Sequence, residues 1–468
     1  MKNPPLLATC CVAALLAACA LATPPPVIAL TPPPEWQAAL PHDGSLTNLS
    51  QWWQSLGDPL LVELVEAAQN AGPTIASAQS RVVQSRAVLV QAQAALLPAL
   101  DATASAERGF TQPGVPVATT VQAGLQASWE IDLFGANRLG SGAAQARLES
   151  AQAQWHDARV SVAAEVASRY YAQRACEQHA TIARMDAASR AQTSRLTALS
   201  TQAGFTAPAT AALARAGAAD SSSRATQQQA LCALDTKALV ALTDWPEPSL
   251  VQKLAAAPND LAPAAGMAIA SVPAQALAQR PDLFSAARDL AAAGADLGGA
   301  AAQQFPRLGL SGSIGATRYR AGALSEDLAT WSIGPLSLSV PLFDAGRRAA
   351  GVDAARARYE EAAFLYRARA RQAVREVEEA LVNLQSTAAR RDDAALADAG
   401  YRTWLAATEA RYASGLASLM EFEETRRTAL AAANALVGLR RERILAWIAL
   451  YRAVGGGWGP AQGSTTTP

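Results

Sequence analysis

The sequence predicts a mainly helical protein that also carries membrane-type β-strands and is built as a tandem duplication. Half of its 468 residues are hydrophobic but only 6% are aromatic, so alanine, the best helix former, supplies much of the apolar content. Two long stretches, Asn137–Ala203 and Ala345–Ala413, contain no proline. A junction from an alternating strand pattern to a helical pattern occurs twice, as SWEIDLFGANRL at Ser128–Leu139 and as SLSVPLFDAGRR at Ser337–Arg348.

The two junctions match at four positions when the chain is shifted by 209 residues. The matching residues are Leu133, Phe134, Ala136 and Arg138 in the first copy and Leu342, Phe343, Ala345 and Arg347 in the second. A glycine turn follows each proline-free stretch, and Gly204 and Gly415 are 211 residues apart, a closely similar shift. We therefore expect two copies of one structural unit.

Residues 1–18 are predicted to be a secretory signal peptide, because Lys2 precedes a short apolar stretch that ends in a cleavage-type motif. That motif, LAAC at Leu16–Cys19, resembles the bacterial lipobox, whose cysteine becomes the acylated first residue of the mature protein. We expect Cys19 to carry acyl chains such as palmitate and the proline-rich residues 19–50 to form a lipid-anchored tether. A plain signal peptide with an incidental cysteine is the alternative.

The first repeat is predicted over residues 51–245. A helical stretch comes first, and two strands follow on either side of a turn-rich loop at Arg108–Thr120. The second strand alternates seven apolar residues with polar ones between Val121 and Leu133, which resembles a transmembrane β-barrel strand. The alternative is a strand of a β-sandwich that faces a protein core. A proline-free helix of about 100 Å and a returning helix to about Thr243 complete the repeat.

The second repeat is predicted over residues 272–454, after a proline-rich crossover at 246–271 with little regular structure. Helix is expected from about Pro273 to Gln304, and then a strand, a loop at Tyr319–Thr330 and a second strand that ends at Leu342. A long helix, the Gly415 turn and a returning helix to about Ala453 follow. Residues 455–468 are expected to be a disordered tail.

Four strands cannot close a membrane barrel, because such barrels begin at about eight strands and open edges cannot face lipid. Spanning strands would therefore have to come from several chains, and three copies would give twelve. This pattern predicts an obligate assembly.

Two cysteines of the mature chain are candidates for a disulfide. Cys176 and Cys232 each lie 28 residues from Gly204, so an antiparallel helical hairpin would place them at one height. A secreted chain makes a disulfide plausible. The alternative is two unrelated small apolar residues in a helix interface.

The whole mature chain resembles the TolC-like outer-membrane factors, in the lipoprotein branch typified by OprM and the NodT-type efflux proteins. The residues that carry this resemblance are QRPDLFSAARDLAAAGADLGGAAAQQFPRLGLSGSIG at Gln279–Gly315, the WWQSLGDPLL segment near the mature N-terminus, LFDAGRR, and RYASGL at Arg411–Leu416. The resemblance implies a homotrimer with a twelve-stranded outer-membrane barrel on a periplasmic α-helical tunnel. It also implies a passive conduit for small molecules that docks with a periplasmic adaptor and an inner-membrane pump, of which the RND type is favoured.

The resemblance also implies site residues. Glu424 and Arg427 match an acid and an arginine that help to constrict the tunnel, and Met420 matches an apolar constriction position. The alternative is an exposed ion pair on a helix surface. The hairpin tips, Gly204 with Phe205 and Gly415 with Leu416, are expected to contact the adaptor, although a tight helix connection alone would explain both glycines.

No catalytic, cofactor-binding or metal site is expected. His42, His156 and His179 are scattered, and equal numbers of acidic and basic residues, 39 each, argue against a nucleic-acid partner. A type I protein-secretion duct and a periplasmic adaptor lipoprotein are the alternative functions. An adaptor should show one helical hairpin and lipoyl-like segments rather than two hairpins and two strand pairs.

Overall fold

A computed structural model describes residues 36–37, 52–110, 117–259, 261 and 277–458 of the chain. The chain divides into two compact units, which are taken in turn. The first contains Gln79–Ala153 and Phe284–Ala368, and the second contains the other described residues. The predicted signal peptide 1–18, Cys19 and nearly all of the tether at 19–50 lie outside the described residues.

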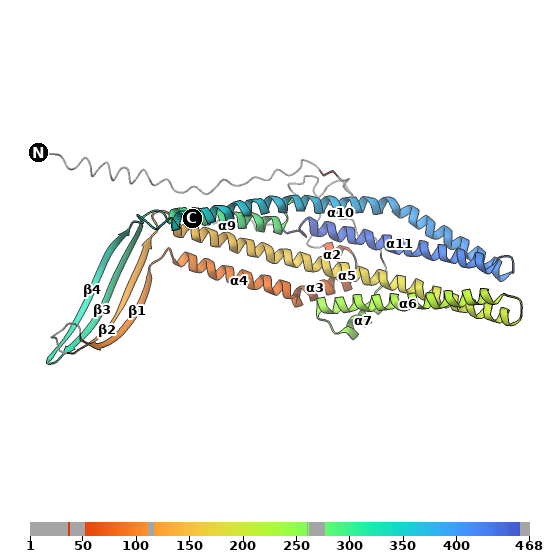
Figure 1. Ribbon diagram of the computed structural model, residues 1–468, viewed down its shortest axis with the longest axis horizontal. Coiled ribbons are helices and arrows are strands. Elements are labelled where there is room, and N and C mark those ends of the chain that lie inside the picture. Colours follow the sequence, from red (N-terminus) through yellow and green to blue (C-terminus); the bar gives the residue numbers. More distant parts are fainter. Residues whose placement is uncertain (1–35, 38–51, 111–116, 260, 262–276, 459–468) are drawn as a thin grey trace. The chain divides into compact units, whose positions relative to one another are not determined.

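The first unit is organised around an antiparallel sheet of four strands in sequence order (Figure 1). These are β1 (Ala99–Gly109), β2 (Ala118–Ile131), β3 (Arg307–Ala321) and β4 (Leu324–Ser339). The strand pairs of the two repeats join edge to edge, because β2 and β3 are paired along their length. In the part of the chain that the structure describes, β1 and β4 each keep one edge without a partner strand.

The two faces of this sheet differ in chemistry, because residues paired across strands point to the same side. One face carries rows of apolar side chains, of which one is Leu125, Ile314 and Trp331. The opposite face is polar, with hydrogen bonds between facing residues of neighbouring strands, such as Gln122 to Ser105 at 2.8 Å. No other described part of the chain covers the apolar face, and Trp331 is 75% exposed.

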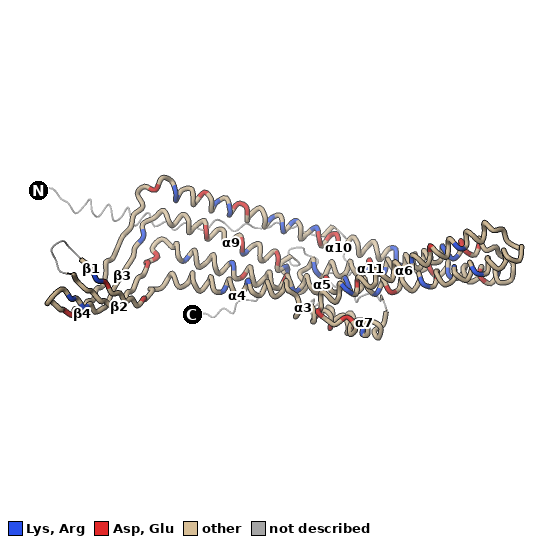
Figure 2. The backbone as a smooth tube through the Cα atoms, turned by 60° about the horizontal axis from the view of Figure 1, so that its bottom comes forward, with Lys and Arg blue, Asp and Glu red and all other residues tan. Residues whose placement is uncertain are grey.

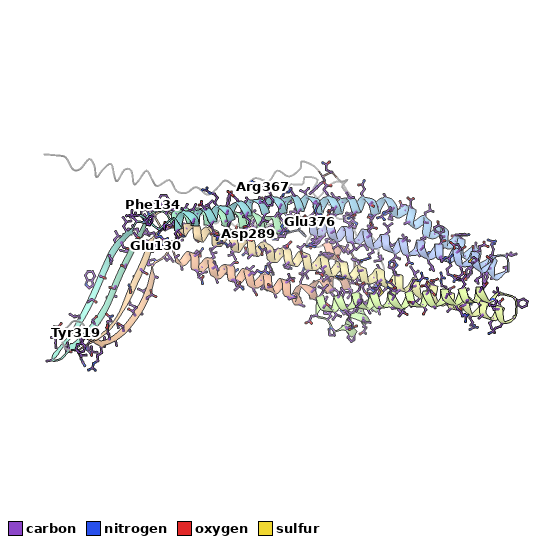
Figure 3. All side chains as sticks on the ribbon, viewed as in Figure 1. Glu130, Phe134, Asp289, Tyr319, Arg367 and Glu376 are labelled. Carbon is purple, nitrogen blue, oxygen red and sulfur yellow. A yellow bond between two sulfur atoms is a disulfide. The ribbon has the colours of Figure 1, made fainter. Side chains whose placement is uncertain are left out.

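Charged residues mark the turn end of the sheet (Figure 2). Arg318 donates two hydrogen bonds to Asp327 across β3 and β4, at 2.6 and 2.7 Å, and Tyr319 lies at the same end (Figure 3). At the opposite end, the indole N–H of Trp129 donates to the carbonyl of Leu96 at 3.0 Å. The apolar face is thus bounded by charge at one end and by an amphipathic aromatic residue at the other, as a lipid-facing band requires.

The strand limits differ from the sequence expectation in two ways. The expectation of a loop at Tyr319–Thr330 is wrong, because both strands continue up to a two-residue turn that begins at Gly322. Gly322 has a φ of +59°, which suits a tight hairpin. The strands also end at Ile131 and Ser339, before the expected Leu133 and Leu342. In the second copy Pro341 has no N–H with which to continue the ladder.

An aspartate follows each strand pair and caps the first turn of a long helix. Asp132 accepts hydrogen bonds from the amides of Asn137 and Arg138 at 3.2 and 2.8 Å. Asp344 accepts one from the amide of Arg348 at 3.2 Å. Both carboxylates satisfy amide groups that the first turn leaves without a partner, and their negative charge suits the helix N-terminus.

The long helices begin at Ala136 and Arg347, which are 211 residues apart, as are the turn glycines. The shift of 209 expected for the helix residues at the junction is therefore wrong. The second copy has two more residues than the first between its Leu-Phe pair and the glycine that precedes the helix. Phe134 of the first junction stacks on Phe305 at a ring distance of 4.9 Å (Figure 3).

Two long helices and two returning helices form antiparallel hairpins, as predicted. They are α5 (Ala136–Gln202), α6 (Pro208–Thr243), α10 (Arg347–Ala413) and α11 (Leu419–Ala453). α5 and α10 have 67 residues each, or about 100 Å at 1.5 Å per residue. Among the described residues, no helix contains a run that is long and apolar enough to cross a membrane.

The core of the second unit gathers short helices around the bases of these hairpins. The short helices are α2 (Trp52–Ser55), α3 (Pro59–Ala71) and α7 (Glu247–Ala256); α4 (Pro73–Ala94) follows α3. Asp58 caps α3 and also accepts a hydrogen bond from the hydroxyl of Tyr170 at 2.5 Å. The largest fully buried apolar side chains of this core are those of Tyr170, Leu61, Leu64, Leu239, Leu250, Leu261, Leu381, Leu450 and Val166.

Three expectations for the second repeat and its flanks need correction. The crossover at 246–271 contains a helix, α7, because its prolines occupy positions that a first turn tolerates and Leu250 and Leu254 share one buried face. The helix expected from about Pro273 to Gln304 is interrupted at Gln279 and Arg280, after which α9 (Pro281–Ala302) begins. Leu277 and Ala278 are helical, and Pro273 lies outside the described residues.

The third correction concerns the expected tail at 455–468. Residues 455–458 are ordered, with Gly455 and Gly456 buried at positive φ. The amide of Gly456 bonds to the carbonyl of Tyr451 at 3.0 Å, so the glycines end α11 in a Schellman turn. A Cβ on Gly455 would lie 2.2 Å from the carbonyl oxygen of Gln279, so no larger residue fits without a backbone shift. Residues 459–468 lie outside the described part.

Candidate functional site

The two hairpin tips share one backbone geometry. The amide of Gly204 bonds to the carbonyl three residues before it, and that of Phe205 bonds to the carbonyl five residues before it, at 3.0 and 2.9 Å. Gly415 and Leu416 repeat both bonds at 3.0 and 2.7 Å. Gly204 and Gly415 have φ of +79° and +74°, where a side chain would be strained.

Each tip turns a large apolar side chain into solvent. Phe205 is 86% exposed and Leu416 is 72% exposed. Neither side chain contributes to the core of its own hairpin, so removing either should have little effect on folding. Exposed apolar residues at such positions are available for contact with another protein.

The expected gate residues lie together on the exposed side of α11. Glu424 and Arg427 form an ion pair, with 62% and 51% of their side chains exposed. Met420, one turn earlier, is also 62% exposed. The three side chains are therefore free to face a tunnel axis in an assembly.

A second acid–arginine pair, which sequence reasoning missed, lies one residue earlier on the same helix. Glu423 and Arg426 form an ion pair at 2.9 Å, and only 14% and 5% of their side chains are exposed. Arg426 lies over the ring of Phe422 at 4.3 Å, and Glu423 also lies 3.8 Å from Arg190 of α5. The spacing of three residues is the same in both pairs, so only packing shows which pair is structural.

Cys176 and Cys232 are bonded as a disulfide in the structure, with their Cα atoms 5.5 Å apart. The bond joins α5 to α6, at the equal distance from Gly204 that the sequence spacing implies. It therefore crosslinks the first hairpin.

Arg280, from the QRPDL motif, joins the two helices of the second hairpin at their base. Its guanidinium donates to Glu376 of α10 at 2.8 Å and to the carbonyl of Ala453 at the end of α11 at 2.7 Å. It also donates twice to Asp282, at 2.9 and 2.7 Å. These groups are called the Arg280 network below. The motif could be recognised in the sequence, but its partners lie 96 and 173 residues away.

Two carboxyl groups at the Arg280 network have pKa values shifted in opposite directions. Burial alone would raise the pKa of Asp282, but hydrogen bonds from Arg280 outweigh it and the pKa lies below its ordinary value. Asp157 of α5 has a raised pKa, because burial and the charge of Asp282 outweigh the attraction of Arg452, Arg280 and Arg369. The ionised form of Asp157 therefore destabilises the folded protein relative to the unfolded chain.

Neither metal nor acid–base chemistry emerges from the described residues. No group of three or more His, Cys, Asp or Glu side chains there could hold a metal ion. The ring of His179 bonds to the side chain of Asn434 at 2.8 Å, and His156 lines a pocket considered below. His42 lies outside the described residues.

A family comparison agrees with this architecture. The profile described as "Outer membrane efflux protein" matches residues 64–243 and 272–456, which is most of the chain. The chain belongs to the outer membrane efflux protein family. Its two matched segments correspond to the two repeats.

Relatives of known role support the same assignment. The efflux protein is 30% identical over 448 residues to the pyoverdine export outer membrane protein OpmQ of Pseudomonas aeruginosa, covering 91% of each chain. It is 26% identical over 437 residues to nodulation protein T of Rhizobium leguminosarum bv. trifolii, again covering 91% of each. Among solved structures, the outer-membrane channel OprN superposes with a TM-score of 0.80 at 27% identity, covering 93% of this chain and 100% of that one.

The efflux protein is therefore an outer-membrane channel with the TolC-like fold, and the predicted family, fold class and outer-membrane location are confirmed. Members of the family are trimers that work with an adaptor and an inner-membrane pump. They are channels rather than enzymes. Membership sets aside the alternative of a periplasmic adaptor lipoprotein.

Proposed function

We propose that three copies of this chain form the exit duct of a tripartite pump for small molecules. The single observation that carries this proposal is the two-faced sheet of four strands, whose apolar face and two outer edges are left open by the residues that the structure describes. Three such sheets joined at β1 and β4 make a closed barrel of twelve strands, which removes the edges and turns the apolar face to lipid.

The helical hairpins then form the periplasmic tunnel. Glu424, Arg427 and Met420 narrow its end at rest, and the tips at Gly204–Phe205 and Gly415–Leu416 receive the periplasmic adaptor. The exposure of all five larger side chains supports these roles, since none is committed to the core of the chain. The proposed inner-membrane pump is of the RND type, and it supplies the energy for transport.

The cargo is proposed to be small molecules rather than protein. Relatives of this chain are named for the export of pyoverdine, solvent and toluene, all of them small compounds. Acylation of Cys19 would add a second attachment to the outer membrane, and residues 19–50 would serve as its tether.

Assembly is tested by light scattering and negative-stain imaging of the detergent-extracted protein. We expect the mass of a trimer and a particle well over 100 Å long, since the helices alone measure about 100 Å. A stable monomer would contradict the proposal, because four strands cannot close alone.

Adaptor docking is tested by substitution at the tips. Phe205→Ala and Leu416→Ala should leave the melting temperature of the trimer unchanged, since both side chains are exposed. They should reduce adaptor binding in a pull-down with the membrane-anchored partner from the same cell. Leu196→Ala, at a residue 45% exposed on α5 away from the tip, is a matched control. Equal binding by tip and control variants would remove the tips from the contact.

A further inference from the structure

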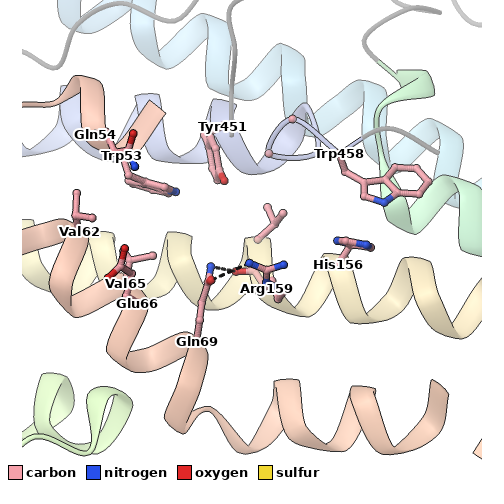
Figure 4. Close-up of a pocket in the computed structure, with 13 residues that line it drawn as sticks. Trp53, Gln54, Val62, Val65, Glu66, Gln69, His156, Arg159, Tyr451 and Trp458 are labelled. Carbon is pink, nitrogen blue, oxygen red and sulfur yellow. Dashed lines mark hydrogen bonds between the residues drawn. The ribbon is translucent and has the colours of Figure 1, made fainter. Parts of the chain in front are cut away.

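The second unit contains a pocket that the channel role does not use. Its volume is about 440 Å³, within the range of small-molecule sites. Helices from both ends of the chain line it, namely α2 and α3, α5, and the C-terminal end of α11 (Figure 4). We call it the aromatic pocket, defined by Trp53, Tyr451, Trp458, His156, Arg159 and Gln69.

Aromatic rings supply much of the wall. Trp53 meets Tyr451 edge to face at a ring distance of 4.7 Å, and Trp458 lies 6.2 Å from His156. Figure 4 shows Trp458 and His156 at one end of the pocket and Trp53 and Tyr451 at the other. A flat ring can therefore enter between aromatic surfaces, where stacked and edge-on contacts are both favourable.

Arg159 gives the pocket a fixed positive group. Its guanidinium donates to the side-chain oxygen of Gln69 at 3.2 Å. The side-chain NH₂ group of Gln69 donates in turn to the backbone carbonyl of Arg159 at 3.5 Å (Figure 4). The guanidinium also lies over the ring of Trp155, with its central carbon 5.3 Å from the ring centroid. Among the described residues, no carboxylate lies within ion-pair distance of Arg159, and Glu66, which also lines the pocket, is exposed.

His156 does not add a second charge to this site at neutral pH. Burial lowers its pKa, and the positive charge of Arg159 lowers it further. The ring is thus neutral and can exchange one hydrogen bond with a ligand, while Arg159 remains the cation inside the pocket.

The glycines at the end of α11 shape this pocket. A Cβ on Gly456 would lie 2.6 Å from a methyl group of Val160 and 3.0 Å from the hydroxyl of Tyr451. Gly456 and Gly457 both have positive φ, of +62° and +81°, and line the pocket, and Trp458 follows them. The close approach that the glycines permit is what brings Trp458 against the α5 side of the site.

We propose that the aromatic pocket binds a planar aromatic carboxylate, with its ring between the aromatic side chains and its carboxylate on the guanidinium of Arg159. The planar fork of an arginine matches a carboxylate through two parallel hydrogen bonds. Gln69 holds that fork before the ligand arrives, which reduces the entropy lost on binding. The site is distinct from the tunnel gate and the tips, and it does not depend on which pump the channel serves.

The test uses the intact detergent-purified protein and two probes of the same shape. Benzoate carries the charge, and benzamide is its neutral counterpart. Titrations followed by saturation-transfer NMR and calorimetry should show benzoate binding at least about tenfold more tightly than benzamide. Arg159→Gln should abolish that preference, and Trp458→Ala should weaken both probes. Arg184→Gln, an exposed arginine farther along α5, should change neither.

Equal affinities of benzoate and benzamide for the wild type would overturn the proposal, and this comparison needs no variant. A benzoate preference that survives Arg159→Gln would also overturn it, provided that the variant elutes as the wild type does on size exclusion. Arg159→Lys offers a milder change that keeps the charge without the planar fork, and it should give an intermediate affinity.

Discussion

The two helical hairpins have the same length and the same turn, but they are held together in different ways. The first, α5 with α6, is crosslinked by the disulfide between Cys176 and Cys232. The second, α10 with α11, has no cysteine and is joined at its base by Arg280, which bonds to both helices. The disulfide depends only on its own hairpin, whereas Arg280 comes from the segment that precedes α9.

The tips differ as well. The first turn carries Phe205 and no charged residue, while the second is flanked by the ion pair of Arg411 and Glu421 at 2.6 Å. The two copies therefore share the backbone conformation of their hairpins, but they differ in the bonds that hold the two helices together and in the charge at the tips. A covalently crosslinked hairpin keeps its two helices in register, whereas a hairpin held by charged groups can respond to their protonation. The following predictions test that contrast.

The largest effect is expected at Arg280. Arg280→Met should lower the unfolding free energy by about 3–5 kcal/mol, because it leaves the buried carboxylate of Asp282 without its partner. Chemical denaturation in detergent measures the loss, and hydrogen exchange should place it at the base of α10 and α11. Arg375→Met, which removes an exposed ion pair of α10, should have an effect below about 1 kcal/mol. Equal losses in the two variants would show that Arg280 does not fasten the hairpin.

Removing the disulfide should have the next largest effect. Cys176→Ser with Cys232→Ser should lower the unfolding free energy by about 2–4 kcal/mol, because the bond closes a loop between residues 56 apart. Faster hydrogen exchange should appear in α5 and α6 but not in α10 and α11. Reduction of the wild type with dithiothreitol should reproduce the result. Equally faster exchange in both hairpins would show that the disulfide does not stabilise the first hairpin alone.

A smaller change of the opposite sign is expected at Asp157. Its pKa is raised in the folded protein, so its ionised form favours unfolding once the pH exceeds the ordinary value near 3.8. Asp157→Asn should therefore raise the melting temperature at pH 7, and the difference from wild type should disappear as the pH falls below that value. Asp235→Asn, on the partly exposed surface of α6, serves as the control and should leave the melting temperature at pH 7 close to that of the wild type.

The smallest effect on stability is expected at the gate. Glu424→Gln with Arg427→Gln should change the unfolding free energy by less than about 1 kcal/mol, since the pair is exposed, but should raise single-channel conductance in planar bilayers. Glu423→Gln with Arg426→Gln should lower the stability of the tip, because this pair is buried, and should leave the single-channel conductance unchanged. Conductance that stays unchanged in the first double variant would remove Glu424 and Arg427 from the constriction.

Local patterns in the chain were sufficient for the long helices and the strands and for their order, but not for the short helix α7. The absence of proline, the alternation of apolar residues and the turn glycines predicted both hairpins to within one or two residues and all four strands. These features depend on neighbours within a few residues, so they can be read without a fold. Where the local signal was ambiguous, as at Tyr319–Thr330, the strand pairing decided, because the register places Arg318 opposite Asp327.

Contacts between distant residues were decided by the tertiary structure alone. Glu423–Arg426 and Glu424–Arg427 have the same spacing, and only packing against Arg190 of α5 buries the first pair and leaves the second exposed. Arg280 bonds to two helices because the fold places the segment that precedes α9 at their base. The aromatic pocket likewise needs Trp53 and Trp458 from opposite ends of the chain. Such groups meet only when folding buries apolar surface over hundreds of residues, and no local pattern encodes that meeting.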